Sequence, residues 1–443
     1  MHCQDRAGGP QARAARGATR RRAARTTLLG AMALVAGACS AATPIPPRSP
    51  LALDNATPAL PAFVASSPTP GPAPTTRPAP TRVVPPLEPL SLPPGFGVGV
   101  FADLGLPVSG LATAPNGDLF VSVPSEDRIL VLPDRDADGV LDDGALAVYA
   151  EGGVLRRPYG IVVRPGWLYV ASTDAVLRLP YADGDLQPSG PAERLAELPP
   201  DGDQWARPLD MGPDGKLYVG VGASCNVCEE TDVRRAAVLQ IDPESGESKI
   251  YSAGLRSPMG LAFHPATGDL WASDRGRIGL GDDRVPDELN RLSPGAHFGW
   301  PYCYGAQRRD TTLAAEPGFC GATLAPMVEL LGQAGVAGLR FYDGLQFPET
   351  YRGDLYVALS GSGLRRELPG GYNIVRVPMN GWAPRGDVFD FASGWLRPDT
   401  RRWGSPVDLE LAADGALLVS DEGGGRIYRI YYAGDPEATP ESP

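Results

Sequence analysis

GLATAPNGDLFVSV, residues 110–123, is the first of six copies of one phrase: an apolar run, a turn rich in Pro, Asp and Gly, and a second apolar run. The other copies span residues 160–172, 209–221, 260–273, 338–359 and 407–420. Each phrase predicts two β-strands joined by a tight turn, because Asn-Gly and Asp-Gly adopt the positive φ angles that hairpin turns require. The first three copies are about 50 residues apart, which is the length of a four-stranded propeller blade.

These repeats predict how the whole domain folds. One such sheet cannot bury its apolar faces alone, so repeats of this kind stack around an axis and share a core. The sequence therefore predicts an all-β fold, a six-bladed β-propeller. A short apolar stretch at residues 95–104 precedes the first repeat, and residues 425–432 end the last. We expect these two segments to pair, so that strands from both termini close one blade and leave no open edge.

Residues 1–38 are predicted to be a targeting segment. Seven Arg precede a short apolar run at residues 27–37, which is too short to span a membrane as a helix. The run ends in small residues before Cys39, as in bacterial lipoprotein signals, where the Cys becomes the lipidated first residue. A cleaved secretory signal is the alternative. Both interpretations predict an exported protein, and the first predicts a lipid anchor in the cell envelope, facing the periplasm or the outer cell surface.

The rest of the chain divides by composition. Residues 39–92 are rich in Pro, Ala, Ser and Thr and predict an extended tether, residues 93–434 hold the propeller, and residues 435–443 predict a disordered tail. The net charge is −12, and removing the seven Arg and one Asp of residues 1–38 gives −12 − 6 = −18. An acidic surface argues against nucleic-acid binding through a basic patch. We expect a monomer that meets a membrane only through its N-terminal lipid.

The six cysteines separate into two groups. Cys3 leaves with the signal and Cys39 is the lipidation site. An even number then remains in an exported domain, which suggests two disulfides. We predict that these pair Cys225 with Cys228, and Cys303 with Cys320. A CxxC pair is alternatively redox-active or zinc-binding, but here it has no helix N-terminus and no second ligand pair.

The segment DRDADGVLDD, residues 134–143, predicts a cation site. Its candidate ligands are Asp134, Asp136, Asp138 and Asp142. Their spacing, with Gly139 for the sharp turn, is that of the start of an EF-hand-like calcium loop. Ala145 stands where such a loop carries its bidentate Glu, so a solvated acidic turn is the alternative. We expect any calcium here to have a structural role.

Several longer motifs together resemble the sorbosone/glucose dehydrogenase family of quinoproteins. They are GLRSPMGLAF (254–263), PDELN (286–290), GWPYCYG (299–305), GASCNVCEE (222–230) and VSDEGGGRIYRI (419–430). The resemblance implies a six-bladed propeller that binds pyrroloquinoline quinone (PQQ) above the central channel. It also implies a calcium ion held by backbone carbonyls, cations that pair with the three carboxylates of PQQ, and a His that takes the proton from a sugar hydroxyl.

The same resemblance indicates which residues would contact the cofactor. Arg256 matches the Arg of the family's first motif. Gly276 and Arg277 fall where backbone carbonyls hold the calcium. Asp287 matches the acidic residue of that loop, and Arg365 is the one residue kept from a Trp-Asn-Arg phrase of the family.

Other positions depart from the family's pattern. Gln204 stands in the place of the catalytic His, and a neutral amide cannot accept the hydroxyl proton. Asn373 and Ser405 stand where a Lys and an Arg are expected. Two downstream histidines do not replace the base, because we expect His264 to lie on the surface in a turn and His297 to be structural.

The sequence leaves two main hypotheses. The first is an exported, membrane-tethered, sugar dehydrogenase-like propeller that oxidises an aldose or polyol with PQQ and passes the electrons to an acceptor. The second is a catalytically degenerate propeller that binds a carbohydrate or a protein partner at the same mouth, which the changes at Gln204, Asn373 and Ser405 favour. A third hypothesis is a hydrolase or lactonase. It would need a cluster of metal-ligating carboxylates in the channel, and the sequence indicates none.

Overall fold

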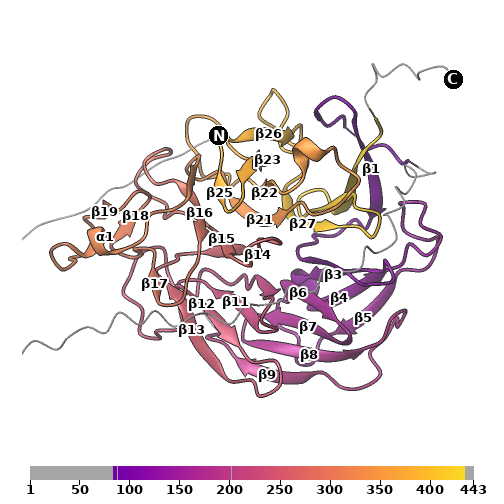
Figure 1. The fold of residues 1–443 in the computed structure, drawn as a ribbon, viewed down its shortest axis with the longest axis horizontal. Helices are drawn as coiled ribbons and strands as arrows, with labels where there is room; N and C mark the ends of the chain where they lie inside the picture. Colours follow the sequence, from indigo (N-terminus) through magenta and orange to yellow (C-terminus); the bar gives the residue numbers. More distant parts are fainter. Residues whose placement is uncertain (1–82, 87, 201, 435–443) are drawn as a thin grey trace, which may run out of the picture. The chain divides into compact units, whose positions relative to one another are not determined.

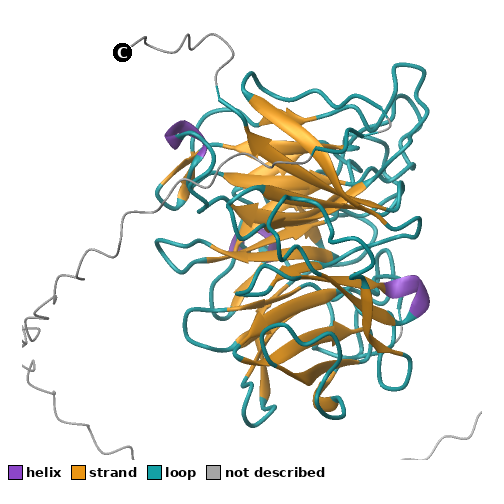
Figure 2. Cartoon of the chain, turned by 90° about the vertical axis from the view of Figure 1, so that its right-hand side faces the viewer, coloured by secondary structure: helices purple, strands orange, loops and turns teal. Residues whose placement is uncertain are grey.

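The computed structural model describes residues 83–86, 88–200 and 202–434. Contacts divide the chain into Met1–Thr69 and Pro70–Pro443, and every described residue lies in the second unit. In this unit, six sheets of four or five strands follow one another in chain order around a ring (Figure 1). Nearly all of its regular structure is strand (Figure 2). The predicted all-β, six-bladed propeller is thus confirmed.

Each of the first three blades is one sheet in chain order. Blade 1 holds β2 (Leu111–Thr113), β3 (Leu119–Val123), β4 (Arg128–Leu132) and β5 (Ala147–Glu151). Blade 2 holds β6 (Gly160–Arg164), β7 (Gly166–Ser172), β8 (Ala175–Tyr181) and β9 (Glu193–Glu197). Blade 3 holds β10 (Leu209–Met211), β11 (Leu217–Val221), β12 (Ala237–Ile241), β13 (Ser248–Ala253) and, parallel to β13, β17 (Ala296–His297).

The other three blades repeat this pattern. Blade 4 holds β14 (Pro258–Phe263), β15 (Leu270–Asp274), β16 (Asp287–Arg291) and β20 (Val328–Leu330). Blade 5 holds β21 (Val336–Phe341), β22 (Leu355–Leu359), β23 (Asn373–Val377) and β26 (Phe389–Ala392). Blade 6 holds β27 (Pro406–Leu411), β28 (Leu417–Asp421), β29 (Arg426–Tyr432) and β1 (Phe96–Asp103).

Short elements fill the connections between these strands. They are η1 (Pro124–Glu126), η2 (Glu349–Tyr351), α1 (Phe319–Ala322), and the two-residue strands β18 (Cys303–Tyr304), β19 (Arg308–Arg309), β24 (Met379–Asn380) and β25 (Ala383–Pro384). Among the described residues, no helix is long and apolar enough to cross a membrane.

The repeated phrase of the sequence forms the first two strands of each blade. Its glycines make the turns between them, as at Gly117 (φ 94°) and Gly415 (φ 86°), whose positive φ an L-residue with a side chain rarely adopts. All five residues are buried in β3, β11, β22 and β28. Neighbouring blades cover both faces of these second strands, which explains why they read as continuous apolar runs rather than as alternating ones.

Strands from both ends of the described chain close blade 6. Strand β1 pairs with β29 in antiparallel register from Phe96 opposite Tyr432 to Asp103 opposite Arg426, which confirms the predicted closure. The ring of Phe96 packs edge-on against Phe347 and Phe391 of the blade 5 region, with centroids 4.8 and 5.2 Å away. Edge-to-face pairs of this kind add roughly 0.5–1.5 kcal/mol each beyond the burial of their surface.

The packed domain begins before the predicted boundary at residue 93. Ser91 forms a β-bridge with Ser393, and the carbonyl of Val84 accepts a hydrogen bond of 2.6 Å from the amide of Val100. Residues 1–82 and 435–443 lie outside the described part of the chain. The predicted signal, Cys39, most of the tether and the tail fall within those two segments.

Candidate functional site

Equivalent backbone hydrogen bonds place one residue from each of several blades at the same end of the central channel. In each case the residue that follows the second strand donates to a carbonyl just before the first strand. The bonds are Thr173 to Arg156, Arg275 to Ser257, Ser360 to Gly335 and Glu422 to Ser405, at 2.8–3.1 Å. We call this end the mouth, and define it by Gln204, Ser257, Arg275, Ser360, Ser405 and Glu422.

Gln204 lies at the mouth beside Ser257. Its side-chain oxygen Oε1 accepts a hydrogen bond of 2.8 Å from the Ser257 hydroxyl. Its backbone amide donates to the carbonyl of Ala223, after β11, and its carbonyl accepts from the buried guanidinium of Arg207. The loop before blade 3 is therefore fixed, and residue 204 presents an amide at the mouth.

Arg256 is buried, with 6 % of its surface exposed, and its guanidinium is bonded to protein groups. Nε and Nη2 donate to the carbonyl and the side-chain oxygen of Asn226, at 3.0 and 3.1 Å. Nη1 donates to the carbonyls of Arg275 and Gly276, at 3.3 and 3.2 Å. Desolvation lowers the pKa of Arg256, and the carboxylates of Asp274 and Asp287 oppose that shift.

Asp287 joins blade 4 to blade 5. Its Oδ1 accepts from the amide of Gly276 at 3.0 Å, and its Oδ2 accepts from the amides of Gly335 and Val336 at 2.8 and 2.9 Å. Only 1 % of its surface is exposed. Burial raises its pKa, and the three amide donors counteract that shift. Asp287 therefore holds the backbone of the loop that the resemblance assigned to the cofactor.

The other two predicted cofactor cations are paired within the protein. Nη1 of Arg277 lies 2.7 Å from Oδ2 of Asp310 and 2.8 Å from the Thr312 hydroxyl. Nη1 of Arg365 lies 2.7 Å from Oδ1 of Asp283 and also donates to the carbonyls of Asp282 and Gly332. Both arginines support loops through these bonds.

The departures from the family pattern have partners of their own. The side-chain nitrogen of Asn373 donates to Asp390 of β26 at 2.6 Å, so this side chain faces the outer strand of blade 5. The Ser405 hydroxyl donates to the carbonyl of Ser360 at 2.7 Å. Neither side chain supplies the positive charge that the resemblance implies at its position.

Three further charged residues lie at the mouth, of which Arg157 and Glu422 were missed by reading the sequence. Arg275 donates to the carbonyl of Val336 and to the Ser360 hydroxyl, both at 2.8 Å. The guanidinium of Arg157 lies over the ring of Trp205, 3.8 Å from its centroid. Desolvation, followed by the carboxylate of Asp421, raises the pKa of Glu422, while Arg275 and Arg157 act to lower it. The signal that would have found Glu422 is its place directly after the second strand of a repeat, which is also the place of Arg275.

The channel also holds charged side chains that the sequence reading missed. Asp210, Arg340, Asp408 and Glu410 line a cavity of about 70 Å³ between the first strands. Arg340 lies 3.6 Å from Glu410, and desolvation raises the pKa of Asp408 to about 7. These carboxylates do not converge: in the described part of the chain, three candidate ligand atoms come within 4.8 Å of one another only at Asp134, Asp136, Asp138 and at Cys225, Cys228, Glu230. The geometry therefore gives no support to a metal-dependent hydrolase site in the channel.

The predicted calcium loop brings three of its four acidic residues together. The ligand atoms of Asp134, Asp136 and Asp138 lie within 4.8 Å of one another, whereas Asp142 accepts from the backbone amide of Arg135 at 3.1 Å. Oδ1 of Asp134 is buried without a hydrogen-bond partner. Desolvation, followed by the neighbouring carboxylates, raises the pKa of Asp134 to about 6. A bound cation would relieve both effects.

The cysteines of the described region pair as predicted, Cys225 with Cys228 and Cys303 with Cys320. One expectation about the histidines was wrong. His264 is 4 % exposed rather than on the surface, because its ring packs edge-on against Phe341 of blade 5, with centroids 4.8 Å apart. Nδ1 of His297 accepts from the amide of Gly299 at 3.0 Å, which is a structural contact.

The mouth does not fit the quinone in the position that the resemblance implies. The carbonyl of Gly276, expected to hold calcium, accepts a hydrogen bond from Arg256, and that guanidinium has protein partners on all three nitrogens. Asn373 and Ser405 are neutral where cations are expected, and Glu422 adds a carboxylate beside the place of a cofactor with three carboxylates. The mouth therefore lacks two of the cations that the resemblance implies, at residues 373 and 405, and a proton acceptor at residue 204.

Comparisons with known proteins agree with the fold. The family model described as Glucose / Sorbosone dehydrogenase matches residues 193–376. A protein of Borreliella burgdorferi, named only as uncharacterized, is 27 % identical over 357 residues, which cover 77 % of this chain and 91 % of that protein.

Two solved structures share the architecture. The holo form of the pyranose dehydrogenase PQQ domain from Coprinopsis cinerea is similar with a TM-score of 0.66 and 20 % identity, over 78 % of this chain and 98 % of that one. The PQQ-bound aldose sugar dehydrogenase from Streptomyces coelicolor gives a TM-score of 0.54 and 20 % identity, over 77 % and 99 % of the two chains. At these identities the likeness shows the fold.

Proposed function

Because the chain belongs to the glucose/sorbosone dehydrogenase family, we propose that it binds an aldose or a similar polyol at the mouth of its channel. The contact between Gln204 and Ser257 carries this proposal. Oε1 of Gln204 accepts a hydrogen bond of 2.8 Å from the Ser257 hydroxyl. Among the described residues, no acceptor is hydrogen-bonded to Nε2 of Gln204. Because the buried Ser257 fixes the carboxamide of Gln204, its Nε2 is held as a donor for a sugar hydroxyl, which both donates and accepts.

The other groups of the mouth suit the same kind of ligand. Arg275 offers donors, and the Ser405 hydroxyl oxygen and the Glu422 carboxylate offer acceptors. A neutral polyol has no charge that would be repelled by Glu422, in contrast to a tricarboxylate. Carbohydrate binding, with no proton transfer to residue 204, is therefore the function that the geometry supports best.

Isothermal titration calorimetry with a panel of aldoses and polyols tests this proposal. We expect Gln204→Ala and Ser257→Ala to weaken the affinity for the best ligand roughly five- to tenfold, since each removes hydrogen bonds worth on the order of 1–1.5 kcal/mol. The matched control is Gln187→Ala, which removes an exposed Gln in the connection from β8 to β9, at the other end of blade 2 from the connection between β7 and β8. Unchanged affinity in both mouth variants would overturn the proposal.

A second candidate is PQQ-dependent oxidation of the same ligand. The retention of Arg256 next to the mouth favours it, as does the fold shared with PQQ-bound sugar dehydrogenases. It requires Arg256 to leave the carbonyls of Gly276 and Asn226, and it requires a proton acceptor other than Gln204. Dye reduction by the purified protein with PQQ, calcium and sugar is the assay that would establish this candidate.

We also propose that the protein is exported and held at the cell envelope by a lipid on Cys39. The Arg-rich start, the short apolar run and the small residues before Cys39 support this proposal. Metabolic labelling with a radioactive fatty acid should mark the wild-type protein and not the Cys39→Ser variant. An exported but unlabelled wild-type protein would identify a cleaved secretory signal instead.

A further inference from the structure

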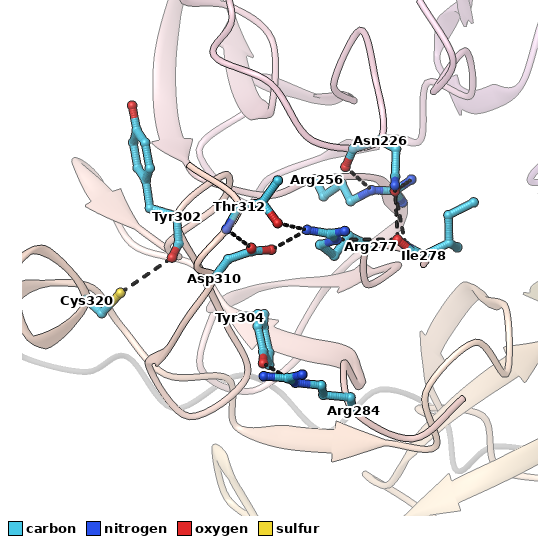
Figure 3. Close-up of polar contacts among 10 residues, drawn as sticks. All are labelled: Asn226, Arg256, Arg277, Ile278, Arg284, Tyr302, Tyr304, Asp310, Thr312 and Cys320. Carbon is cyan, nitrogen blue, oxygen red and sulfur yellow. Dashed lines mark hydrogen bonds and ion pairs between the residues drawn. The ribbon is translucent and has the colours of Figure 1, made fainter. Parts of the chain in front are cut away.

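The loop of residues 275–278, which follows β15 of blade 4, is held from two sides by segments that each contain a disulfide. On one side lies the four-residue loop closed by Cys225 and Cys228. On the other lies the blade 4 insertion, in which Cys303 pairs with Cys320. Figure 3 shows the contacts by which both segments reach the loop. Its first residue, Arg275, belongs to the mouth.

Asn226, inside the Cys225–Cys228 loop, makes the first set of contacts. Its side chain pairs with the backbone of Ile278 in both directions: Oδ1 accepts from the amide at 3.0 Å and Nδ2 donates to the carbonyl at 3.0 Å. The same Oδ1 and the Asn226 carbonyl accept from Arg256, whose other donors reach the carbonyls of Arg275 and Gly276. Through these bonds Asn226 touches both ends of the loop, one directly and one through Arg256.

The second set of contacts comes from the insertion. Asp310, whose amide donates to the carbonyl of Tyr302, forms the ion pair with Arg277. Arg277 in turn donates from Nε to the carbonyl of Ile278 at 3.3 Å. The two disulfide-containing segments also meet each other, because the half-buried Cys225 and Cys228 pack against Trp300 of the insertion.

We infer that Asn226 is a positioning residue that sets the 275–278 loop, and that the Cys225–Cys228 disulfide keeps it in place. The mouth therefore depends on the oxidation state of this disulfide. The carboxamide of Asn226 is useful only in one orientation, because Oδ1 serves two donors while Nδ2 serves one acceptor. Closing the backbone from residue 225 to residue 228 restricts the conformations that would turn this side chain away.

The redox step is ordinary dithiol chemistry. A dithiol reductant gives two electrons and two protons to the disulfide and is itself oxidised to a disulfide, leaving free thiols on Cys225 and Cys228. The loop between them is then open, and Asn226 samples rotamers that release Ile278 and Arg256. This inference deepens the proposed function, because Arg275 is part of the proposed carbohydrate site.

Hydrogen–deuterium exchange of the ligand-free protein tests the inference without any sugar, so its failure is distinct from a failure of carbohydrate binding. In Asn226→Ala, the amide of Ile278 should exchange at least about tenfold faster than in the wild type, because its acceptor is gone. The amide of Gly276 in the same loop is the internal control, since it is held by Asp287 and not by Asn226. Asn226→Asp keeps the acceptor oxygen and should restore most of the protection of Ile278.

The role of the disulfide is tested with Cys225→Ser/Cys228→Ser and with dithiothreitol. Both should accelerate exchange at Ile278, and the reductant should add little in the double variant. Cys303→Ser/Cys320→Ser is the matched control for loss of a disulfide, and should leave the contacts of Asn226 with Ile278 intact. Unchanged exchange at Ile278 in folded Asn226→Ala would overturn the inference. That variant keeps both disulfides, so the result stands even if the cysteine variants fail to fold.

Discussion

The side chain of Gln204, just before the first strand of blade 3, accepts a hydrogen bond of 2.8 Å from the hydroxyl of Ser257, just before the first strand of blade 4. This contact joins two blades at the mouth of the channel. It also occupies Oε1 of Gln204, which stands at the position where the resemblance to the family implies a catalytic base. A carboxamide in this place can orient a hydroxyl but cannot remove its proton.

Arg256 should contribute strongly to stability. Replacing it with Met removes every bond from its guanidinium to the carbonyls of Asn226, Arg275 and Gly276 and leaves those partly buried acceptors without this donor. We expect the free energy of unfolding to fall by roughly 2–4 kcal/mol, as for other buried charged hydrogen-bonding groups. Urea denaturation followed by tryptophan fluorescence measures this change. A Met variant as stable as the wild type would show that the guanidinium does not hold the loop.

The carboxylate of Asp408 should make stability depend on pH. Desolvation raises its pKa from 3.8 to about 7, so between these values the folded state binds more protons than the unfolded state. The free energy of unfolding therefore falls as the pH rises through this range. Groups that act on Asp408 include Glu410, which raises its pKa, and Arg340, which lowers it, and both line the same cavity as Asp210.

Asp408→Asn should remove this dependence. In the wild type, Oδ2 of Asp408 accepts a hydrogen bond of 2.9 Å from the amide of Leu111. The side-chain oxygen of Asn can accept the same bond. Thermal unfolding at pH 5 and pH 8 should show a smaller loss of Tm with pH in this variant than in the wild type. The exposed Asp387→Asn is the control and should behave as the wild type does. Equal pH profiles in Asp408→Asn and the wild type would exclude a role for this carboxylate.

Calcium should stabilise the loop of Asp134, Asp136 and Asp138. Calcium at 100 times its dissociation constant stabilises the folded state by about 2.7 kcal/mol, which corresponds to a rise in Tm on the order of 5 °C for a domain of this size. Asp134→Asn/Asp136→Asn should abolish the rise, and a chelator should reverse it in the wild type. If the double variant responds to calcium as the wild type does, the ion binds elsewhere.

The sequence predicted the fold well because the signals for it are local. A turn glycine and an apolar run on each side of it are sufficient to define the hairpins, and six copies define the ring. The pairing of β1 with β29 followed from the need to close an edge. His264 was misplaced because the residue that covers it, Phe341, belongs to the next blade and not to its own hairpin.

The site was less accessible to sequence reasoning, for a physical reason. The sequence located Arg256, Gly276, Arg277 and Asp287 but not their partners Asn226, Asp310 and Val336, which are 30 to 49 residues away. Whether a buried carboxylate such as Asp287 binds a ligand or backbone amides depends on those distant groups. Glu422 was missed because it is a loop residue whose equivalence to Arg275 appears only when the blades are compared.

We propose that the mouth no longer fits a tricarboxylate quinone and binds a polyol instead. Calorimetric titration of the purified protein with PQQ in the presence of calcium is the decisive experiment. We expect no saturable binding of PQQ by a protein that binds its sugar ligand under the same conditions. Tight binding of PQQ with sugar-dependent dye reduction would contradict it, and would show that Arg256 turns from its carbonyl partners to the cofactor.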